Sequence, residues 1–354
     1  MISRHCRLLI AVGIFIGLSL PPENVIPGLT GNYHATVIPR LTGKQTRNVI
    51  PGLTGEQTRN RHPRLDRETN TKRHPRLDRG SNTINMNFKN ANVLITGGAS
   101  GIGKIMGRRA LQKGAKCFII WDINIQGIEA VRQEFGKYGK VKGYVVDVSD
   151  NEAIKAAYRQ TVEECGDIDI LINNAGIITS NKTFDQQTEG EIVKTMQINT
   201  LAPMFVTLAV LPDMLKRDRG HICNITSAGG MLANPKMSVY AASKWAAIGW
   251  SDSVRIELQQ MKSKVHVTTV APFYIRTGMF EGVKSWLIPI LPPEYVAKRV
   301  IKAIERNTIF RGIPFSSHFI RFWQTVLPIC VFDFIFGKVV GLYHALDHFT
   351  GRKQ

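Results

Sequence analysis

The sequence predicts an α/β fold in three layers (α/β/α), with one doubly wound parallel sheet between two layers of helices. From Met86 onward, short β-branched runs alternate with segments of helical period, the pattern of parallel strands joined by right-handed crossovers. The first apolar run ends in a glycine-rich turn. The composition changes on both sides of this region, which we place at 86–313, between an extension at 1–85 and an apolar tail at 314–354.

The expected strands are continuously apolar, as strands covered on both faces must be. They lie at 92–96, 117–121, 143–148, 168–173, 221–227, 265–271 and 307–313. The expected helices between them lie at 102–113, 126–135, 151–164, 188–217 and 239–261. Ligands of such folds bind beyond the carboxyl ends of the strands, so chemistry should follow each apolar run.

Residues 1–85 repeat themselves and differ from the rest of the chain. The stretch NVIPGLTGN at 24–32 returns in altered form at 48–60, and RHPRLDRETN at 61–70 returns at 73–82. Each copy contains Pro or Gly where a helix or strand would need to continue. We therefore expect this low-complexity extension to be disordered.

A second hypothesis is that the working protein begins at Met86, which opens MNFKNANVLITGG just before the first expected strand. The upstream repeats would then be a misassigned start. The apolar run 8–20 follows Arg4 and Arg7, as in a signal peptide or a weak anchor, but it is short for a membrane span. Both a membrane anchor and an incidental segment remain open.

The chain is basic, with 46 Lys and Arg against 27 Asp and Glu and a net charge of +19. Such a balance suits an anionic cofactor or a membrane surface, and no motif for nucleic-acid recognition accompanies it. None of the 5 cysteines forms a CxxC pair, which indicates reduced thiols inside the cell and no metal site. We expect a cytoplasmic protein, with or without membrane association.

The first expected strand ends in TGGASGIG at 96–103. Glycine permits a tight turn and lets the backbone approach a pyrophosphate closely, while the following helix offers unpaired N–H groups. A glycine cluster alone also occurs in ordinary turns, but its place between strand and helix predicts a Rossmann-type dinucleotide site. The residues expected to contact the cofactor here are Gly97, Ser100, Gly101, Ile102 and Gly103.

Asp122 ends the second strand, about 20 residues after the glycines. A carboxylate there accepts hydrogen bonds from the adenosine ribose hydroxyls and repels the 2′-phosphate of NADP. Neither Ser100 nor Ile123 is a cation that would reverse this preference, so we expect NAD rather than NADP. The alternative is a solvated carboxylate at the end of a strand.

Asp147 and Val148 follow the third strand in VVDVSD, where the aspartate can accept from the adenine amino group. Asp147 could equally cap the next helix, although Ser149 and Asp150 are better placed for that.

The fourth strand ends in NNAG. Its small residues would let the sheet lie close under the cofactor, and its amides can tie strand ends together. We expect cofactor contacts from Asn174, Ala175 and Gly176, although NNAG alone could be a simple turn.

Tyr240 and Lys244 are one helical turn apart and project from the same face of the expected helix 239–261. Ser227 ends the fifth strand, and Asn199 lies in the expected helix 188–217. A tyrosine can exchange a proton with a substrate if a nearby ammonium and a cationic nicotinamide lower its pKa. In this hypothesis the serine holds the substrate oxygen, the lysine also binds the nicotinamide ribose, and the asparagine supports a proton-refilling water chain.

The alternative is that Tyr240 is an ordinary core residue and Lys244 a lysine with its ammonium at the surface. A dinucleotide-type half upstream and a serine at the end of the fifth strand favour the catalytic interpretation.

Together these residues closely resemble the short-chain dehydrogenase/reductase family, from about residue 88 to 313. The family motifs stand here as TGGASGIG, NNAG, the helix Asn199, the strand-end Ser227 and YAASK. APFYIRTGM resembles the family's Pro-Gly motif, but Phe273 replaces the usual glycine. The resemblance implies nicotinamide contacts from Pro272 and Thr277.

Within the family the sequence is most similar to membrane-associated retinol and 17β-hydroxysteroid dehydrogenases. This similarity implies an NAD-dependent interconversion of an alcohol and a carbonyl on a lipophilic molecule. It also implies a homodimer or homotetramer that pairs through the helices expected at 188–217 and 239–261.

The segment 278–295 lies where the family places its substrate lid, and it is rich in large apolar residues. This favours an apolar substrate, although the same side chains could merely pack the lid down. The tail after 313 is also very apolar, but Arg321, Asp333 and Lys338 interrupt it, which disfavours a membrane-spanning helix. An interfacial segment in peripheral membrane contact and a protein-covered extension remain alternatives.

Three functions follow from these observations. The first is an NAD(H)-dependent dehydrogenase or reductase acting on a retinoid, a steroid or a long-chain alcohol. The second is an acyl-chain ketone reductase using NADPH, which Asp122 disfavours. The third is a non-catalytic cofactor-binding scaffold, which the intact Ser227, Tyr240 and Lys244 disfavour.

Overall fold

The protein is described here by a computed structural model, which covers residues 86–284 and 289–351. The expectations for residues 1–85 and the lid residues Trp286, Leu287 and Ile288 lie outside the described residues. The described residues all belong to one compact unit.

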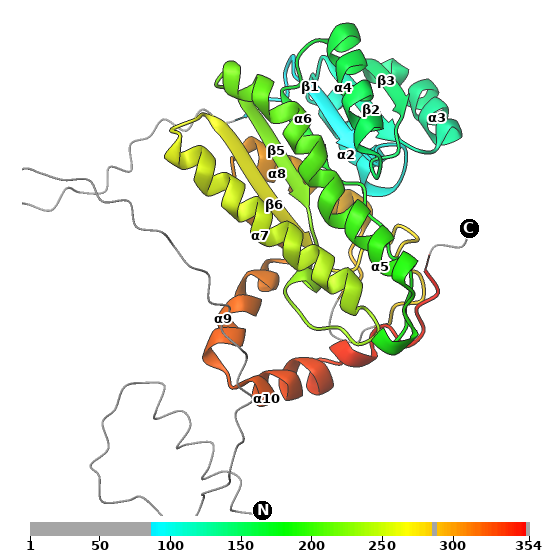
Figure 1. The fold of residues 1–354 in the computed structure, drawn as a ribbon, viewed down its shortest axis with the longest axis vertical. Helices are drawn as coiled ribbons and strands as arrows, with labels where there is room; N and C mark the ends of the chain where they lie inside the picture. The colour runs from blue at the N-terminus through cyan, green and yellow to red at the C-terminus, as the bar shows by residue number, and fades with distance from the viewer. Residues whose placement is uncertain (1–85, 285–288, 352–354) are drawn as a thin grey trace, which may run out of the picture. The chain divides into compact units, whose positions relative to one another are not determined.

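The centre of the fold is a seven-stranded sheet in the order β3-β2-β1-β4-β5-β6-β7, with every neighbouring pair parallel (Figure 1). The strands are β1 (Asn92–Thr96), β2 (Cys117–Asp122), β3 (Lys140–Val145), β4 (Ile170–Asn173), β5 (Gly220–Ile225), β6 (Val265–Pro272) and β7 (Phe310–Ile313). The order reverses between β1 and β4, which is the switch point where ligands bind in such sheets. The predicted doubly wound parallel sheet is confirmed.

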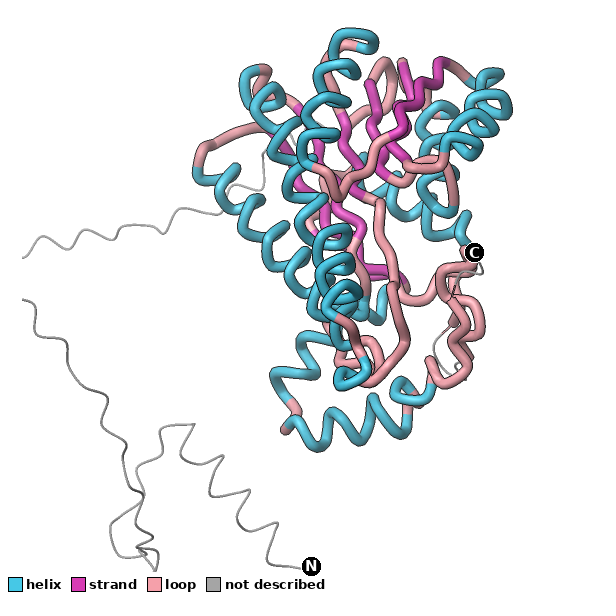
Figure 2. The backbone as a smooth tube through the Cα atoms, turned by 45° about the vertical axis from the view of Figure 1, so that its right-hand side comes forward, coloured by secondary structure: helices cyan, strands magenta, loops and turns pink. Residues whose placement is uncertain are grey.

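Helices cover both faces of the sheet, as the tube view shows (Figure 2). They are α2 (Gly101–Gln112), α3 (Ile125–Phe135), α4 (Asn151–Cys165), α5 (Glu189–Met196), α6 (Ala202–Lys216), α7 (Ser238–Gln260) and α8 (Pro293–Glu305). The helices α2, α3 and α8 pack on one face and α4, α6 and α7 on the other. Both faces are therefore buried, which explains the continuously apolar strands.

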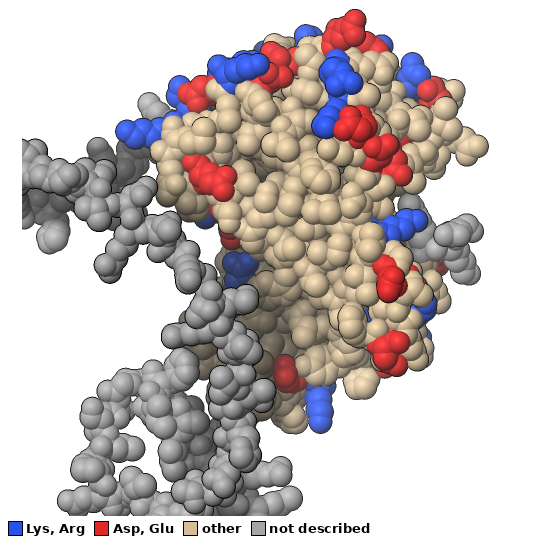
Figure 3. Space-filling view, in the orientation of Figure 1, with Lys and Arg blue, Asp and Glu red and all other residues tan. Residues whose placement is uncertain are grey.

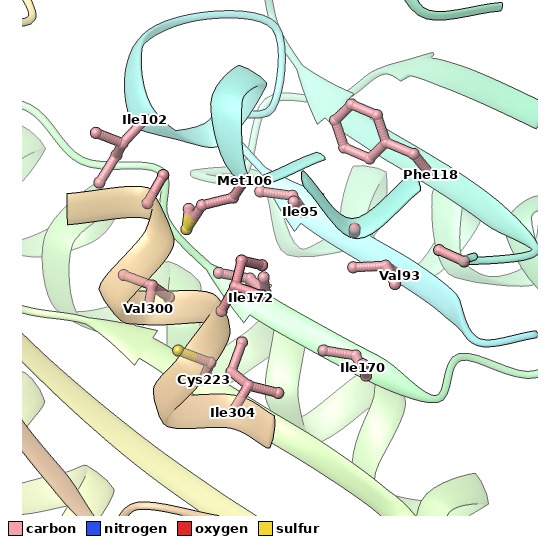
Figure 4. Packing of buried hydrophobic residues seen from close by; sticks show 14 of the residues in the cluster. Val93, Ile95, Ile102, Met106, Phe118, Ile170, Ile172, Cys223, Val300 and Ile304 are labelled. Atoms are coloured by element: carbon pink, nitrogen blue, oxygen red, sulfur yellow. The ribbon is translucent and has the colours of Figure 1, made fainter. Parts of the chain in front are cut away.

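Alternate residues of each central strand point to opposite faces and enter two separate cores. Val93 and Ile95 of β1 belong to one core and Leu94 to the other. Figure 4 shows the first core, where Met106 of α2 and Val300 of α8 lie over the strand side chains.

Several predicted strand bounds differ from the structure. β3 spans Lys140–Val145 rather than 143–148, and β5 ends at Ile225 rather than 227. β4 begins at Ile170 rather than 168, and β7 begins at Phe310 rather than 307. β3 is an edge strand with only β2 as neighbour, so its polar start (KVKG) carries no continuous apolar signal. The helix α8 was not predicted at all, although its buried face is strongly apolar.

The expected helix 188–217 is continuous in direction but contains a five-residue π-helical segment, Gln197–Leu201, between α5 and α6. Single π turns inside helices are frequent at functional sites. Among the described residues this combined helix, Glu189–Lys216, is the one long and apolar enough to cross a membrane, with a mean hydropathy of 1.5. It packs on the sheet through Val206, Val210 and Met214, so its apolar face has a place in the fold.

The tail after β7 consists of short helices at one end of the domain (Figures 1 and 2). They are a 3₁₀ turn at Phe315–Phe319, α9 (Ile320–Val326), α10 (Ile329–Phe332), a π-helical segment at Asp333–Val339 and a 3₁₀ turn at Leu342–His344. Their buried side chains join those of the loops that follow β5 and β6 in a third apolar cluster.

Candidate active site

One cavity lies at the carboxyl ends of the strands, around the switch point between β1 and β4. All but two of the seventeen different residues expected in the site line it; the exceptions are Gly103 and Asn199. Sequence reasoning missed other lining residues, because they carry no motif and reach the cavity only through the fold. They include Trp121, Ile123, Val146, Ile177, Lys194, Ile198 and Ile225.

The glycine turn has the backbone geometry that a close-bound pyrophosphate needs. Gly97 and Gly101 have φ values of +63° and +55°, a region that side chains disfavour. α2 begins at Gly101, so its unpaired N–H groups point at the cavity. A Cβ on Gly103 would lie 2.2 Å from the carbonyl oxygen of Gly97, so this glycine lets the helix pack against the turn.

The NNAG segment after β4 is hydrogen-bonded to the glycine turn after β1. The Asn174 side-chain amide donates to the carbonyl oxygens of Thr96 (3.0 Å) and Gly97 (3.1 Å). The hydroxyl oxygen of Thr96 accepts from the backbone N–H groups of Asn174 and Ala175. Asparagine side chains thus tie the ends of β1 and β4 together, as the sequence indicated.

The Asp122 carboxylate lines the cavity and also holds the glycine turn, because it accepts from the backbone N–H of Ala99 at 3.0 Å. Its other oxygen accepts from the N–H of Asn124 at 3.1 Å. Each oxygen keeps a lone pair for a ligand hydroxyl. The neighbouring Ile123 is exposed and carries no charge.

Asp147 and Val148 line the same cavity, two and three residues after β3 ends. Asp147 accepts from the backbone N–H and the hydroxyl of Ser149. Asp150, not Asp147, caps α4, since it accepts from the N–H groups of Glu152 and Ala153. The Asp147 side chain is therefore free of the capping role that was its alternative.

Asn199 lies behind the cavity wall, in the π-helical segment, and is 2% exposed. Its side chain accepts from the N–H of Ile177 and donates to the carbonyl of Ile177 and to the Ser243 hydroxyl. A Cβ on Gly176 would lie 3.2 Å from Asn199 Oδ1 and 3.3 Å from Lys244 Nζ. Gly176 thus separates the asparagine from the lysine, and its small size lets both approach.

Ser227, Tyr240 and Lys244 meet in one wall of the cavity. The Ser227 hydroxyl caps a short 3₁₀ turn by accepting from the N–H of Gly229 at 3.0 Å, and it also forms a hydrogen bond with the Tyr240 side chain. Lys244 Nζ lies 5.9 Å from the centre of the Tyr240 ring and donates to the carbonyl of Ile225 at 3.4 Å. The predicted triad is therefore brought together.

Burial dominates the electrostatics of this wall. It raises the pKa of Tyr240 to about 12, against the lowering effect of the Ser227 hydrogen bond. It lowers the pKa of Lys244 to about 8. The lowering of the tyrosine pKa by the ammonium together with a cationic nicotinamide stays a prediction for the protein with its cofactor bound.

The segment after β6 covers the cavity. Pro272, Phe273 and Thr277 all line it, and the Thr277 side chain lies 3.8 Å from where a Cβ on Gly101 would be. Phe273 has an ordinary negative φ, so replacement of the family's glycine leaves no left-handed strain here. Phe280 stands edge-on to the Tyr240 ring, with 6.3 Å between centroids.

A nicotinamide dinucleotide fits these residues. The glycine turn lines the cavity through Gly97 and Gly101, and the carboxylates of Asp122 and Asp147 stand beside it for hydroxyl and amino groups. Within the described residues no group of three His, Cys, Asp or Glu side chains could hold a metal ion. The arrangement suits hydride chemistry with proton transfer at a tyrosine.

Comparisons with known proteins agree with this geometry. A family model described as short chain dehydrogenase matches residues 91–288. Epidermal retinol dehydrogenase 2 of Mus musculus is 34% identical over 268 residues, 74% of this chain and 86% of that protein. Estradiol 17-beta-dehydrogenase 11 of Homo sapiens is 35% identical over 240 residues, 67% of this chain and 79% of that protein.

A solved metagenomic short-chain oxidoreductase in complex with NADP is 26% identical, with a TM-score of 0.55, and the match covers 64% of this chain and 96% of that one. Fold, family model and relatives agree: this chain is an oxidoreductase that belongs to the short-chain dehydrogenase family, whose fold binds nicotinamide cofactors.

Proposed function

We propose that this protein is an NAD(H)-dependent oxidoreductase that interconverts an alcohol and a carbonyl on a lipophilic substrate. The observation that carries the proposal is the meeting of Ser227, Tyr240 and Lys244 in one wall of the dinucleotide cavity. The cofactor, when bound, supplies or accepts the hydride.

The protein side of the reaction is proton transfer and positioning. The Ser227 hydroxyl donates to the substrate oxygen and holds it beside the Tyr240 hydroxyl. Tyr240 gives its proton to a carbonyl oxygen in reduction, or takes the proton of an alcohol in oxidation. Lys244, buried nearby, stabilises the phenolate and is placed to contact the nicotinamide ribose. Asn199 acts as a positioning residue behind them, held by three hydrogen bonds.

NAD is proposed over NADP on the strength of Asp122. A carboxylate next to the adenosine ribose accepts hydrogen bonds from its hydroxyls and repels a 2′-phosphate. Among the described residues that line the cavity, the cations are Lys194 and Lys244, and Lys244 is committed to the catalytic wall. The NADPH-linked reduction of an acyl-chain ketone is the runner-up, and direct comparison of the two cofactors separates them.

A lipophilic substrate is supported by the apolar walls around Tyr240. The segment after β6 supplies Phe273, Tyr274 and Phe280 to these walls, and the loop after β5 supplies Leu232 and Met237. The names of the relatives, retinol dehydrogenase and estradiol 17-beta-dehydrogenase, point to the same class of substrate.

Substrate profiling of the full chain tests the proposed function. NADH and NADPH fluorescence would be followed with a panel of retinoids, steroids, long-chain alcohols and aliphatic ketones. Turnover of lipophilic alcohols or carbonyls with NAD(H) is expected. Turnover with NADP(H) alone would favour the runner-up, and cofactor binding without any turnover would favour a non-catalytic scaffold.

We also propose a homodimer or homotetramer that forms through the helices in front of the sheet. Uncharged residues cover the middle of this face, over α6 and α7 (Figure 3). Exposed apolar side chains there include Leu208, Trp245 and Ile256. Light scattering of the wild type and of Leu208→Glu checks this pairing, and an unchanged mass for the variant would argue against it.

Peripheral membrane contact is proposed for the outer side of the tail. Many of its exposed residues are large and apolar, with Ile329 at 77% exposure. They lie on α9, α10 and the following π-helical segment: Phe322, Trp323, Val326, Ile329, Val331, Phe334 and Val339. Aromatic and aliphatic side chains of this kind bind at lipid boundaries. Flotation with liposomes is the test, and protein that stays at the bottom of the gradient would contradict it.

A further inference from the structure

A small apolar hollow adjoins the cofactor cavity and shares Ser227, Tyr240, Phe273 and Phe280 with it. Three segments far apart in the sequence line this hollow. The loop after β5 supplies Leu232, Asn234 and Met237, the segment after β6 supplies Tyr274 and Phe280, and the C-terminal tail supplies Leu342 and Leu346. The tail therefore reaches the reacting side chains, which its position in the sequence does not suggest.

The two tail leucines face inward and are nearly inaccessible. Leu342 is 3% and Leu346 4% exposed, and both belong to the apolar cluster formed with Leu232, Met237 and Tyr274. Val339 of the same tail is 51% exposed and lines no described cavity. The tail thus has an inner side that faces the hollow and an outer side that does not.

Hydrogen bonds fasten the tail to the loops around the hollow. The N–H of Lys284 donates to the carbonyl of Ala345 at 3.1 Å, and the N–H of Thr350 donates to the carbonyl of Glu281 at 3.0 Å. The side-chain amide of Asn181 donates to the carbonyl of Leu346 at 3.0 Å. These contacts pair the tail with residues 281–284 and with the loop after β4.

An aromatic contact continues from the tail to the proposed catalytic tyrosine. The ring of Phe349 lies 6.5 Å from that of Phe280, which in turn lies 6.3 Å from that of Tyr240. Gly282 lets the tail come this close: a Cβ there would be 2.0 Å from the carbonyl oxygen of His348. Displacement of the tail would therefore change the surroundings of Phe280.

We infer that the C-terminal segment 342–350 forms the far wall of the substrate pocket, and that Leu342 and Leu346 determine which lipophilic substrates fit. The inference rests on the proposed function and adds to it the residues that select among lipophilic substrates. A substrate with its hydroxyl or carbonyl between Ser227 and Tyr240 extends its apolar body against these leucines. Contact with the wall then favours long or bulky alcohols over short ones.

Two pairs of variants of the full chain test the wall. Leu346→Ala removes an inward side chain, and Val339→Ala removes an outward one from the same tail. Gly282→Ala pushes the tail away, while Gly278→Ala is its matched control, because the two glycines have φ values of +84° and +83° but Gly278 has no neighbour within 4 Å. The readouts are kcat/KM from butanol to tetradecanol, NADH affinity and thermal unfolding.

We expect Leu346→Ala and Gly282→Ala to lower kcat/KM for the longest alcohols by about tenfold or more, through KM, and to leave butanol and NADH binding unchanged. The two control variants should keep the wild-type selectivity. If long and short alcohols change in equal proportion, or if each variant matches its control, the wall is refuted. Should Leu346→Ala fail to fold, the glycine pair decides.

Binding of cis-parinaric acid, a fluorescent apolar chain, separates this inference from the proposed function. Its affinity should fall in Leu346→Ala and Gly282→Ala and not in their controls. A wild type that turns over no alcohol with either cofactor but shows this binding pattern would refute the proposed function and keep the wall. Normal turnover, with probe binding and selectivity unchanged in the variants, would keep the proposed function and refute the wall.

Discussion

The cofactor side and the substrate side of this molecule are built in different ways. On the cofactor side, short motifs at strand ends carry the site, and each motif is local in sequence. On the substrate side, the hollow beside Tyr240 is assembled from the loop after β5, the segment after β6 and the distant tail. The chemistry of the cofactor side can therefore be predicted from the sequence, whereas the shape of the substrate side depends on long-range packing.

Tyr240 stands where the two sides meet, and its loss gives the largest expected effect. In Tyr240→Phe the ring remains but the proton donor and acceptor is gone, so we expect kcat/KM to fall by about 10³-fold. NADH binding should remain, because the glycine turn and Asp122 are untouched. Tyr138→Phe, at a tyrosine exposed to solvent outside the cavity, is the control. Unchanged turnover would remove Tyr240 from its role.

Lys244, in the same wall, is expected to support turnover while its buried charge lowers the stability of the fold. Its pKa of about 8 lies below its ordinary value of 10.5, because burial penalises the ammonium. Between these pH values the folded protein binds fewer protons than the unfolded one, so stability rises with pH through this window. The penalty is full below about pH 8 and absent above pH 10.5.

We therefore expect Lys244→Met to stabilise the protein by about 3 kcal/mol at pH 7 while turnover collapses. The gain should shrink as the pH rises toward 10.5. Urea unfolding at pH 7 and pH 10 measures it, with the exposed Lys116→Met as control. A gain that does not depend on pH would contradict the burial of a charged Lys244.

Two glycines inside helices predict opposite results. Gly103→Ala places a Cβ 2.2 Å from the carbonyl oxygen of Gly97, so we expect a loss of about 1–3 kcal/mol in stability and weaker NADH binding. Gly249 of α7 has no neighbour within 4 Å, and Gly249→Ala should add about 0.5–1 kcal/mol without affecting NADH binding. Thermal unfolding and NADH titration compare the two variants. If their effects are equal, the packing of α2 against the glycine turn tolerates a Cβ at Gly103.

Much of the fold followed from the sequence because buried parallel strands are apolar throughout. β1, β2 and β6 match their predicted ranges to within a residue. The edge strand β3 was displaced because an edge needs no apolar start. The π-helical turn at Asn199 and the inward position of Leu346 carry no local signal, since contacts between segments far apart in the sequence accompany both.

The site residues show the same division. The glycine turn, NNAG and the Tyr-Lys pair are recognisable because their spacing is short and their chemistry narrow. Asn234 was missed, although its side-chain oxygen is buried in the substrate hollow without a partner among the described residues. An asparagine in a loop has no distinguishing neighbour in sequence, so only the fold reveals what it faces.

Asp122 offers the finest distinction on the cofactor side, between two dinucleotides that differ by one phosphate. Solved structures that share this fold hold NAD in one case and NADP in another, so the choice rests with local charge. In Asp122→Ser the ribose loses a charged acceptor, and we expect kcat/KM for NAD to fall by about tenfold while that for NADP holds or rises.

The same substitution also removes the acceptor for the N–H of Ala99, so the glycine turn must be shown to persist. Thermal unfolding and titration with NADH and NADPH provide that measure, with Asp185→Ser at an exposed aspartate outside the cavity as control. If both cofactors weaken equally, Asp122 acts through the turn alone and discriminates nothing. If only the binding of NADH weakens, the Asp122 carboxylate contacts the ribose directly and discriminates between the cofactors. The choice of cofactor is then determined by a short local motif, like the other contacts on the cofactor side.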